Sequence, residues 1–184
     1  MDAVSSLNSV KVFFGGLETL YTFLTTSLPR YKILEEEQQK MLDGPDTRWA
    51  SRKRAADAVI QSSTAIQEAL DHIRVHRGSS PKAASEADGL LKKVRTFEFT
   101  LMLTSWNTLL KKIFALSNYL QQESFDVNTA VQLIDACMLQ ITELRSLEAF
   151  VAMENMARDL ATLCKGATDY LQDRVRKKKK TFLS

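Results

Sequence analysis

The chain has 184 residues, of which 45% are hydrophobic and 26% are charged, and its formal net charge is +3. Six glycines and three prolines make up about 5% of it, against about 12% in average usage. So few turn-forming residues argue against a β-sandwich, a barrel or repeated βαβ units, and the apolar fraction excludes a disordered chain. We therefore expect a helical globular protein with a hydrophobic core.

The first expected helix covers about residues 8–26, where large apolar side chains recur at three- and four-residue intervals. Gly15 and Gly16 lie inside it, and each costs about 1 kcal/mol relative to alanine. They would either kink the helix or let a neighbouring element approach closely. A second expected helix follows Pro29, a favoured first-turn residue, and runs to about Leu42.

The third expected helix begins after Asp46 or Thr47, both favoured as N-caps, and ends near Arg77. Its expected inward residues are Trp49, Ala56, Val59, Ile60, Ala65, Ile66, Leu70 and Ile73. A turn follows, in which Ser80 is the expected N-cap and Pro81 the first residue of the fourth helix.

The second half of the sequence predicts two helices of about 40 residues, which is long for a globular protein. One covers residues 82–122, and its segment 97–106 is apolar on nearly every face, as expected of a central, buried helix. The other begins at Asp126 as N-cap and runs to about residue 173. Its expected inward stripe is Val131, Ile134, Met138, Ile141, Leu144, Leu147, Val151 and Met156.

Together these elements predict an all-α fold, a bundle of about five helices of which two or three are long and antiparallel. Kinks are expected near Gly89 and Gly166. No segment alternates with the period of two that is typical of a strand.

The charge is unevenly distributed along the sequence. Six basic residues lie close together near the C-terminus: Arg174, Arg176, Lys177, Lys178, Lys179 and Lys180. Without them 19 Lys and Arg stand against 22 Asp and Glu, so residues 1–173 carry a net charge of −3. We expect residues 1–173 to form one helical domain and residues 174–184 to form a basic tail. This tail is either a nuclear-import or phosphate-binding segment or a frayed helix end.

The sequence lacks the features of a secreted or membrane protein. Its N-terminus has no signal-peptide pattern, and no apolar run approaches the roughly 18 residues of a membrane span. Cys137 and Cys164 are too few and too far apart for a disulfide scaffold, so we expect buried thiols in a reducing compartment. The prediction is a soluble intracellular protein with no membrane partner, located in the nucleus or otherwise in the cytoplasm.

Motifs for catalysis or cofactor binding are missing from the sequence. It contains no glycine-rich phosphate loop, no CxxC pair and no nucleophile elbow. His72 and His76 stand one helical turn apart and offer two metal ligands, but the sequence suggests no third. We therefore expect no cofactor, no metal site and no small-molecule substrate.

The basic residues around Trp49 are the candidate binding site. Arg48, Arg52, Lys53 and Arg54 cluster there, and Arg48 and Arg52 lie one turn apart on the same helix face. Cations beside a flat aromatic ring can grip phosphates while the ring stacks on a base. Spacing alone favours the alternative, in which Trp49 belongs to the core and the arginines are solvated.

Several segments of the sequence resemble one known family. They are Asp46-Thr47-Arg48-Trp49-Ala50-Ser51-Arg52, Phe13-Phe14, Leu20-Tyr21, 27–31, 89–95, Phe97-Glu98-Phe99, Trp106-Asn107, 126–131 and 174–177. They are similar to segments of proteins derived from hAT-superfamily transposases, and most of all to the zinc finger MYM-type group. The likeness covers almost the whole chain, and its most specific parts are the TRW element and the stretch from FEF to WN.

The resemblance implies that the chain matches one part of such a transposase. In that family an RNase H-like domain carries an Asp-Asp-Glu triad that binds two metal ions, and a long all-helical domain is inserted before the last acid. The chain resembles this insertion alone, which implies that it is not an enzyme, because two-metal chemistry needs converging carboxylates. The family's TRW tryptophan lies close to transposon DNA, which implies a DNA contact for Trp49 with Arg48 beside it.

Two hypotheses follow for the function. The first is a non-catalytic, transposase-derived helical module that acts as a protein-interaction or weak nucleic-acid-binding domain. The second is a DNA-binding fragment of a hAT-type transposase that uses the Trp49 cluster and the basic tail. The expected partners are DNA, another protein, or a related transposase-derived chain.

Overall fold

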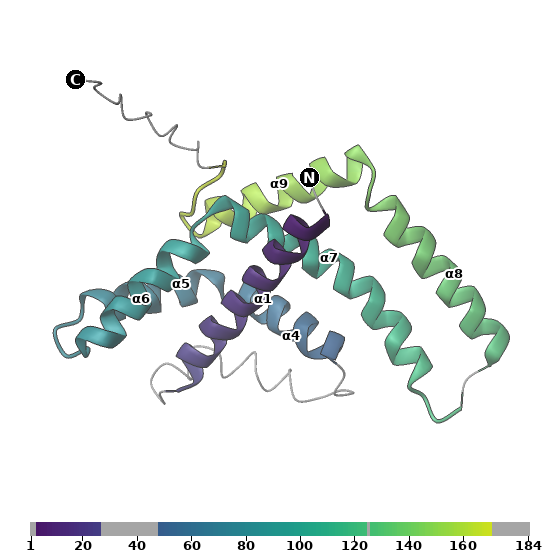
Figure 1. Cartoon of the computed structure of the whole chain (residues 1–184), viewed down its shortest axis with the longest axis horizontal. Coiled ribbons are helices and arrows are strands. Elements are labelled where there is room, and N and C mark those ends of the chain that lie inside the picture. Colours follow the sequence, from purple (N-terminus) through teal and green to yellow (C-terminus); the bar gives the residue numbers. More distant parts are fainter. Residues whose placement is uncertain (1–2, 27–47, 125, 171–184) are drawn as a thin grey trace, which may run out of the picture.

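The computed structural model describes residues 3–26, 48–124 and 126–170 (Figure 1). Over these ranges it contains seven helices and no strand, which confirms the all-α prediction with more helices than the five expected. They are α1 (Ala3–Thr25), α4 (Arg48–Gln61), α5 (Ser63–Val75), α6 (Pro81–Val94), α7 (Phe97–Leu120), α8 (Val127–Glu143) and α9 (Leu147–Leu163). The expected helix at 29–42, the caps Asp46 and Thr47, and the tail 174–184 lie outside the described residues.

Each of the three long expected helices is divided into two, and at two of the divisions a hydroxyl side chain caps the second helix. Thr96 accepts a hydrogen bond from the Phe99 N–H at 3.2 Å and donates one to the Lys93 carbonyl at 2.8 Å. It therefore ends α6 and begins α7. Ser146 begins α9 in the same way, accepting from the Ala149 N–H at 3.1 Å. These hydroxyls satisfy N–H groups that the start of a helix leaves without a partner.

The glycines singled out in the sequence have different roles in the structure. Helix α6 continues through Gly89, where a kink was expected. Near Gly166 the helix has already ended, since Lys165 adopts a left-handed φ of 54° and the Gly166 N–H donates back into the last turn of α9. Gly16 admits a close neighbour, because the end of the Lys93 side chain lies where a Cβ would stand.

The caps predicted at Ser80 and Asp126 are confirmed, and the core predicted for the third helix is confirmed in part. Ser80 accepts from the Ala83 N–H at 3.2 Å with Pro81 in the first turn of α6, and Asp126 accepts from the Thr129 N–H at 2.7 Å at the start of α8. Among the residues expected inward on the third helix, Ala56, Ile66 and Leu70 are buried, Val59, Ile60 and Ile73 are half-buried, and Ala65 is exposed.

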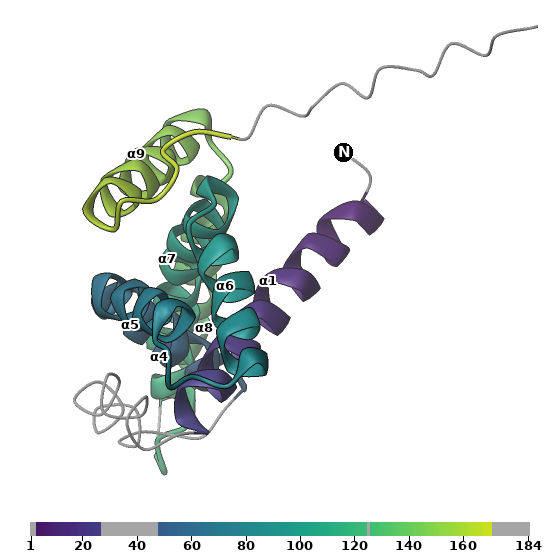
Figure 2. The ribbon, with the colours of Figure 1, turned by 90° about the vertical axis from the view of Figure 1, so that its left-hand side faces the viewer.

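The hydrophobic core is formed by α1, α4, α5, α6 and the first half of α7. Its buried members are Phe13, Leu17, Leu20, Phe23, Leu24, Ala56, Ile66, Leu70, Ala87, Leu90, Leu91, Val94, Phe99 and Leu103. As expected, α7 is central, since it packs against α4, α6, α8 and α9. In the side view α1 passes close to α6, whose Lys93 ammonium donates to the Val12 carbonyl at 3.2 Å (Figure 2).

The segment after α9 returns to the junction between α6 and α7. The Ala167 N–H donates to the Arg95 carbonyl at 2.8 Å, and the Tyr170 ring meets the Phe97 ring edge-on with centroids 5.0 Å apart. This contact fixes α9 across the start of α7 (Figure 1).

Helix α8 stands outside the core. It runs antiparallel to the C-terminal half of α7, and the two form an arm that extends from the rest of the molecule (Figure 1). Ala130 and Cys137 are its buried residues, and the Lys112 ammonium on α7 donates to the Gln140 side chain at 3.3 Å. Among the described helices none is long and apolar enough to cross a membrane.

The prediction that the apolar stripe of residues 131–156 faces inward is wrong. Six of its eight members are exposed: Val131, Ile134, Met138, Leu147, Val151 and Met156. The reason is that α8 turns a neighbouring set of smaller side chains toward α7, where Ala130 and Cys137 let the two helices approach closely. The larger side chains are left on the outside of the arm.

Candidate functional site

The predicted basic cluster is only partly within the described side chains. The structure describes the side chains of Arg52, Lys53 and Arg54 on α4. The side chains outside the described set are those of Arg48, Trp49, Arg174, Arg176, Lys177, Lys178, Lys179 and Lys180. Consecutive residues of an α-helix point about 100° apart, so the three described cations cannot share one face.

Arg52 and Lys53 are directed to different neighbours. The Arg52 guanidinium lies over the ring of Phe14 on α1, 4.3 Å from its centroid. The Lys53 ammonium lies 5.0 Å from the centroid of the Phe114 ring on α7 and pairs with the Asp57 carboxylate at 2.6 Å. The cluster is thus divided between the two sides of α4.

Lys53 takes part in the packing of α4 against α7. The second oxygen of Asp57 accepts a hydrogen bond of 2.6 Å from the buried amide of Asn107 on α7. Because a buried amide needs such a partner, the set of Lys53, Asp57 and Asn107 stabilises the fold. The Lys53 ammonium is therefore engaged within the fold.

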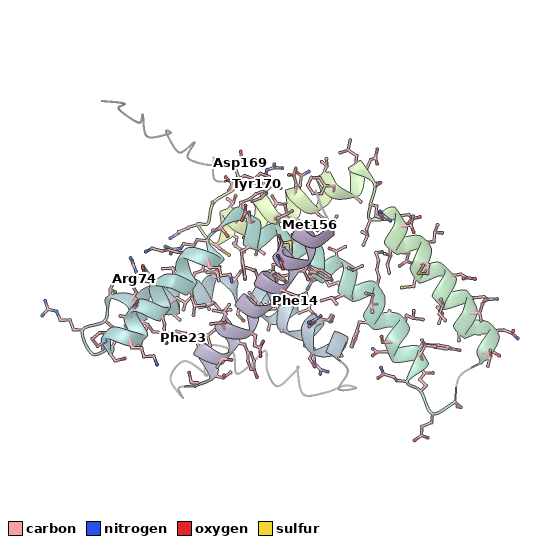
Figure 3. All side chains as sticks on the ribbon, in the orientation of Figure 1. Phe14, Phe23, Arg74, Met156, Asp169 and Tyr170 are labelled. Atoms are coloured by element: carbon pink, nitrogen blue, oxygen red, sulfur yellow. The ribbon has the colours of Figure 1, made fainter. Side chains whose placement is uncertain are left out.

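A cleft of about 620 Å³ separates α1 from α4, and we call it the cationic cleft. Arg52, Arg54 and Lys11 line it with the rings of Phe14 and Tyr21, and Glu18 is the acidic residue of its lining. Figure 3 labels Phe14 on α1, which contributes the ring beneath Arg52. Cations next to aromatic rings suit a flat, anionic group. Sequence reasoning found the arginines but missed the rings, because α1 is distant in the sequence.

Large apolar side chains are exposed along α8. Four of them follow one line of the helix, and we call them the α8 stripe: Val127, Val131, Ile134 and Met138, exposed by 67, 52, 41 and 63%. On α9 a further set is exposed, comprising Leu147, Phe150, Val151, Met156 and Leu163. Soluble proteins rarely expose large apolar patches, and such patches are often interaction sites.

The α8 stripe lies next to the side of α8 that packs on α7. Ala130 and Cys137 on that side are buried, and the Cys137 thiol lies 3.9 Å from the Lys112 carbonyl oxygen. At 100° per residue the stripe and this packed side are centred about 80° apart. The helix therefore has a broad apolar surface, of which α7 covers one half.

The helix that carries the α8 stripe is acidic. Residues 127–143 contain Asp135 and Glu143 and no lysine or arginine, a net charge of −2, whereas residues 48–120 contain twelve basic and six acidic residues, a net charge of +6. Asp135 is exposed and flanks the stripe on the side away from α7. A negative field repels nucleic acid and anionic lipid and attracts basic groups.

Asp126 holds the start of α8 as its N-cap. The hydroxyl and the N–H of Thr129 donate to the same carboxylate oxygen at 2.8 and 2.7 Å. These hydrogen bonds hold the pKa of Asp126 below its usual value, because they favour the ionised carboxylate. The cap fixes where the stripe begins.

The two histidines lie on the exposed end of α5. Their ring centroids are 5.0 Å apart, and Nδ1 of His76 accepts a hydrogen bond from the Gly78 N–H at 3.0 Å. Over the described ranges no three His, Cys, Asp or Glu side chains come together to hold a metal ion. Both cysteines are buried, as predicted, and the Cys164 thiol donates to the Ser63 hydroxyl at 3.0 Å.

Comparison of the chain with protein-family models, with curated proteins and with solved structures found no significant match. The resemblance to hAT-superfamily transposases stays a prediction.

Proposed function

We propose that the chain is a non-catalytic, transposase-derived helical module that binds a protein partner through the α8 stripe. The observation that carries the proposal is the exposure of Val127, Val131, Ile134 and Met138 along one line of a helix. Covering one such side chain contributes on the order of 1 kcal/mol, so a partner that covers all four gains several kcal/mol.

The surroundings of the stripe favour a protein over a nucleic acid as the partner at this face. The net charge of −2 on α8 repels phosphates. None of the core residues named above belongs to α8, so a partner can cover the stripe without displacing the helices of the core.

Photocrosslinking in cells tests the proposal. A photoreactive amino acid at position 138 should form adducts with protein, because Met138 is a strongly exposed member of the α8 stripe. The same amino acid at the exposed Ala65 on α5 is the control and should give few adducts. Equal yields at both positions, or adducts with nucleic acid at position 138, contradict the proposal.

Weak nucleic-acid binding is a second candidate function, and the cationic cleft favours it. Arg52, Arg54 and Lys11 offer positive charge beside the Phe14 ring, at a site separate from the α8 stripe. Binding of a fluorescent single-stranded oligonucleotide should weaken as salt rises. The variant Arg52→Ala should weaken it and make it less dependent on salt, because one cation of the cleft is removed.

The matched control for Arg52→Ala is Lys82→Ala, which removes one positive charge from an exposed site on α6. If both variants lose affinity equally, the binding is a diffuse electrostatic effect. If no oligonucleotide binds at low salt, the cleft does not bind nucleic acid.

A further inference from the structure

The spacing of the α8 stripe matches the contact line of two packed helices. Val127, Val131, Ile134 and Met138 follow one another at intervals of four, three and four, and the half-buried Ile141 continues the series. This is the spacing of the a and d positions in a coiled coil. From residue 127 to 141 the line is about 21 Å long at 1.5 Å per residue, which is enough for four turns of a partner helix.

The arm already supplies two helices of a bundle. Helices α7 and α8 are antiparallel, and Ala130 and Cys137 pack between them. Two helices alone bury only one side of each, and helical bundles complete their cores with a third or fourth helix. A helix laid along the α8 stripe would cover the side that α7 leaves exposed.

The charges beside the stripe indicate what the partner helix carries. Asp135 is exposed next to Ile134 and Met138, on a helix of net charge −2. Residues that flank the apolar line of a coiled coil select the partner through charge pairing. A second copy of this chain, packed antiparallel about Ile134, would bring Asp135 close to its own counterpart and would oppose two negative surfaces.

We propose that the α8 stripe binds a basic amphipathic helix of another protein, one whose apolar a and d residues are flanked by lysine or arginine. This inference rests on the proposed function and adds the chemistry of the partner. Apolar contact along Val131, Ile134 and Met138 supplies affinity, and Asp135 supplies the preference for a basic helix.

Two designed 21-residue peptides test the inference against the full chain. Both carry leucine and isoleucine at the a and d positions; one has lysine and the other glutamate at the flanking positions. Measured by fluorescence anisotropy at physiological salt, the lysine peptide should bind at least tenfold more tightly. A lysine peptide with alanine at the a and d positions should not bind, which excludes charge alone as the cause.

Three variants locate the binding on the protein. Ile134→Asp should weaken binding of the lysine peptide at least tenfold. Because Ile134 is exposed, the variant should keep the melting temperature of the parent chain. Asp135→Lys should remove or reverse the preference between the peptides. Glu143→Lys makes the same charge change on the opposite side of α8 and should leave the preference nearly unchanged, since salt screens charges beyond about 8 Å.

The outcomes separate this inference from the proposed function. If both peptides bind equally and Ile134→Asp abolishes the binding, the preference for a basic partner is wrong, but the α8 stripe is still a docking face. No peptide binding together with no protein adducts at position 138 overturns both. Dimerisation in sedimentation that Ile134→Asp abolishes assigns the face to a second copy. A further variant has glutamine in place of each lysine from Lys177 to Lys180. If this variant binds the lysine peptide and the parent chain does not, the chain's own basic residues occupy the face, and the inference is wrong.

Discussion

The two ends of this molecule use apolar residues in opposite ways. In α1 and α4–α7 the large side chains meet in one core, and the sequence of α4–α7 carries a net charge of +6. In α8 and α9 comparable side chains are exposed, and the net charge of residues 127–163 is −3. Apolar periodicity therefore identifies a helix surface that needs to be covered, whereas tertiary packing decides whether the chain itself covers it.

The largest effect is expected in the core. Leu70 is fully buried on α5, so Leu70→Ala should lower the free energy of unfolding by about 2–5 kcal/mol through lost burial and a cavity. Urea unfolding followed by circular dichroism measures the change. A loss of unfolding free energy below about 1 kcal/mol would contradict tight packing of the core around Leu70.

A smaller effect is expected at the junction of α6 and α7. Thr96→Ala removes the cap of α7 and should cost about 1 kcal/mol. Ser85→Ala is the control, because Ser85 is exposed inside α6 and alanine is the better helix former there. If both substitutions have the same effect on urea unfolding, the hydroxyl does not divide the helices.

The arm should respond to acid through Asp126. The folded-state pKa of this carboxyl is lowered, so its contribution to stability is present above the unfolded value near 3.8 and is lost as the pH falls through the lower folded value. The protection factor of the Thr129 amide, which is its exchange rate relative to the intrinsic rate at each pH, should therefore fall at the lowest pH. Asp126→Asn should remove this pH dependence, and an unchanged profile in the variant would assign it to another group.

The smallest effect on stability is expected on the α8 stripe. Met138→Ala should change the free energy of unfolding by less than about 0.5 kcal/mol, because the side chain is already exposed. The same variant should weaken the lysine peptide described above. A loss of stability close to that of Leu70→Ala would show that Met138 is buried within the chain in solution.

Much of the fold could be predicted from local signals. Ser80, Pro81 and Asp126 mark helix starts by residue type, and the apolar segment 97–106 marks the central helix. The divisions at Thr96 and Ser146 could not be predicted with the same ease, because a hydroxyl inside a helical pattern either caps a new helix or bonds within the old one. Tertiary packing selects between these two.

The candidate sites depend more strongly on tertiary contacts. On α8 both the set with Ala130 and Cys137 and the set with Ile134 and Met138 have helical spacing, so periodicity does not say which one faces α7. The contact of Arg52 with Phe14 joins two helices that are distant in the sequence, and single-residue patterns carry no such information.

Hydrogen exchange of the full chain with and without the lysine peptide tests the central claim most directly. We expect slower exchange over residues 127–141 and no change in α5, because the peptide helix covers the α8 stripe and leaves the core unchanged. Protection confined to α1 and α4, beside the cationic cleft, or no protection in α8 at saturating peptide, would contradict a docking face on α8.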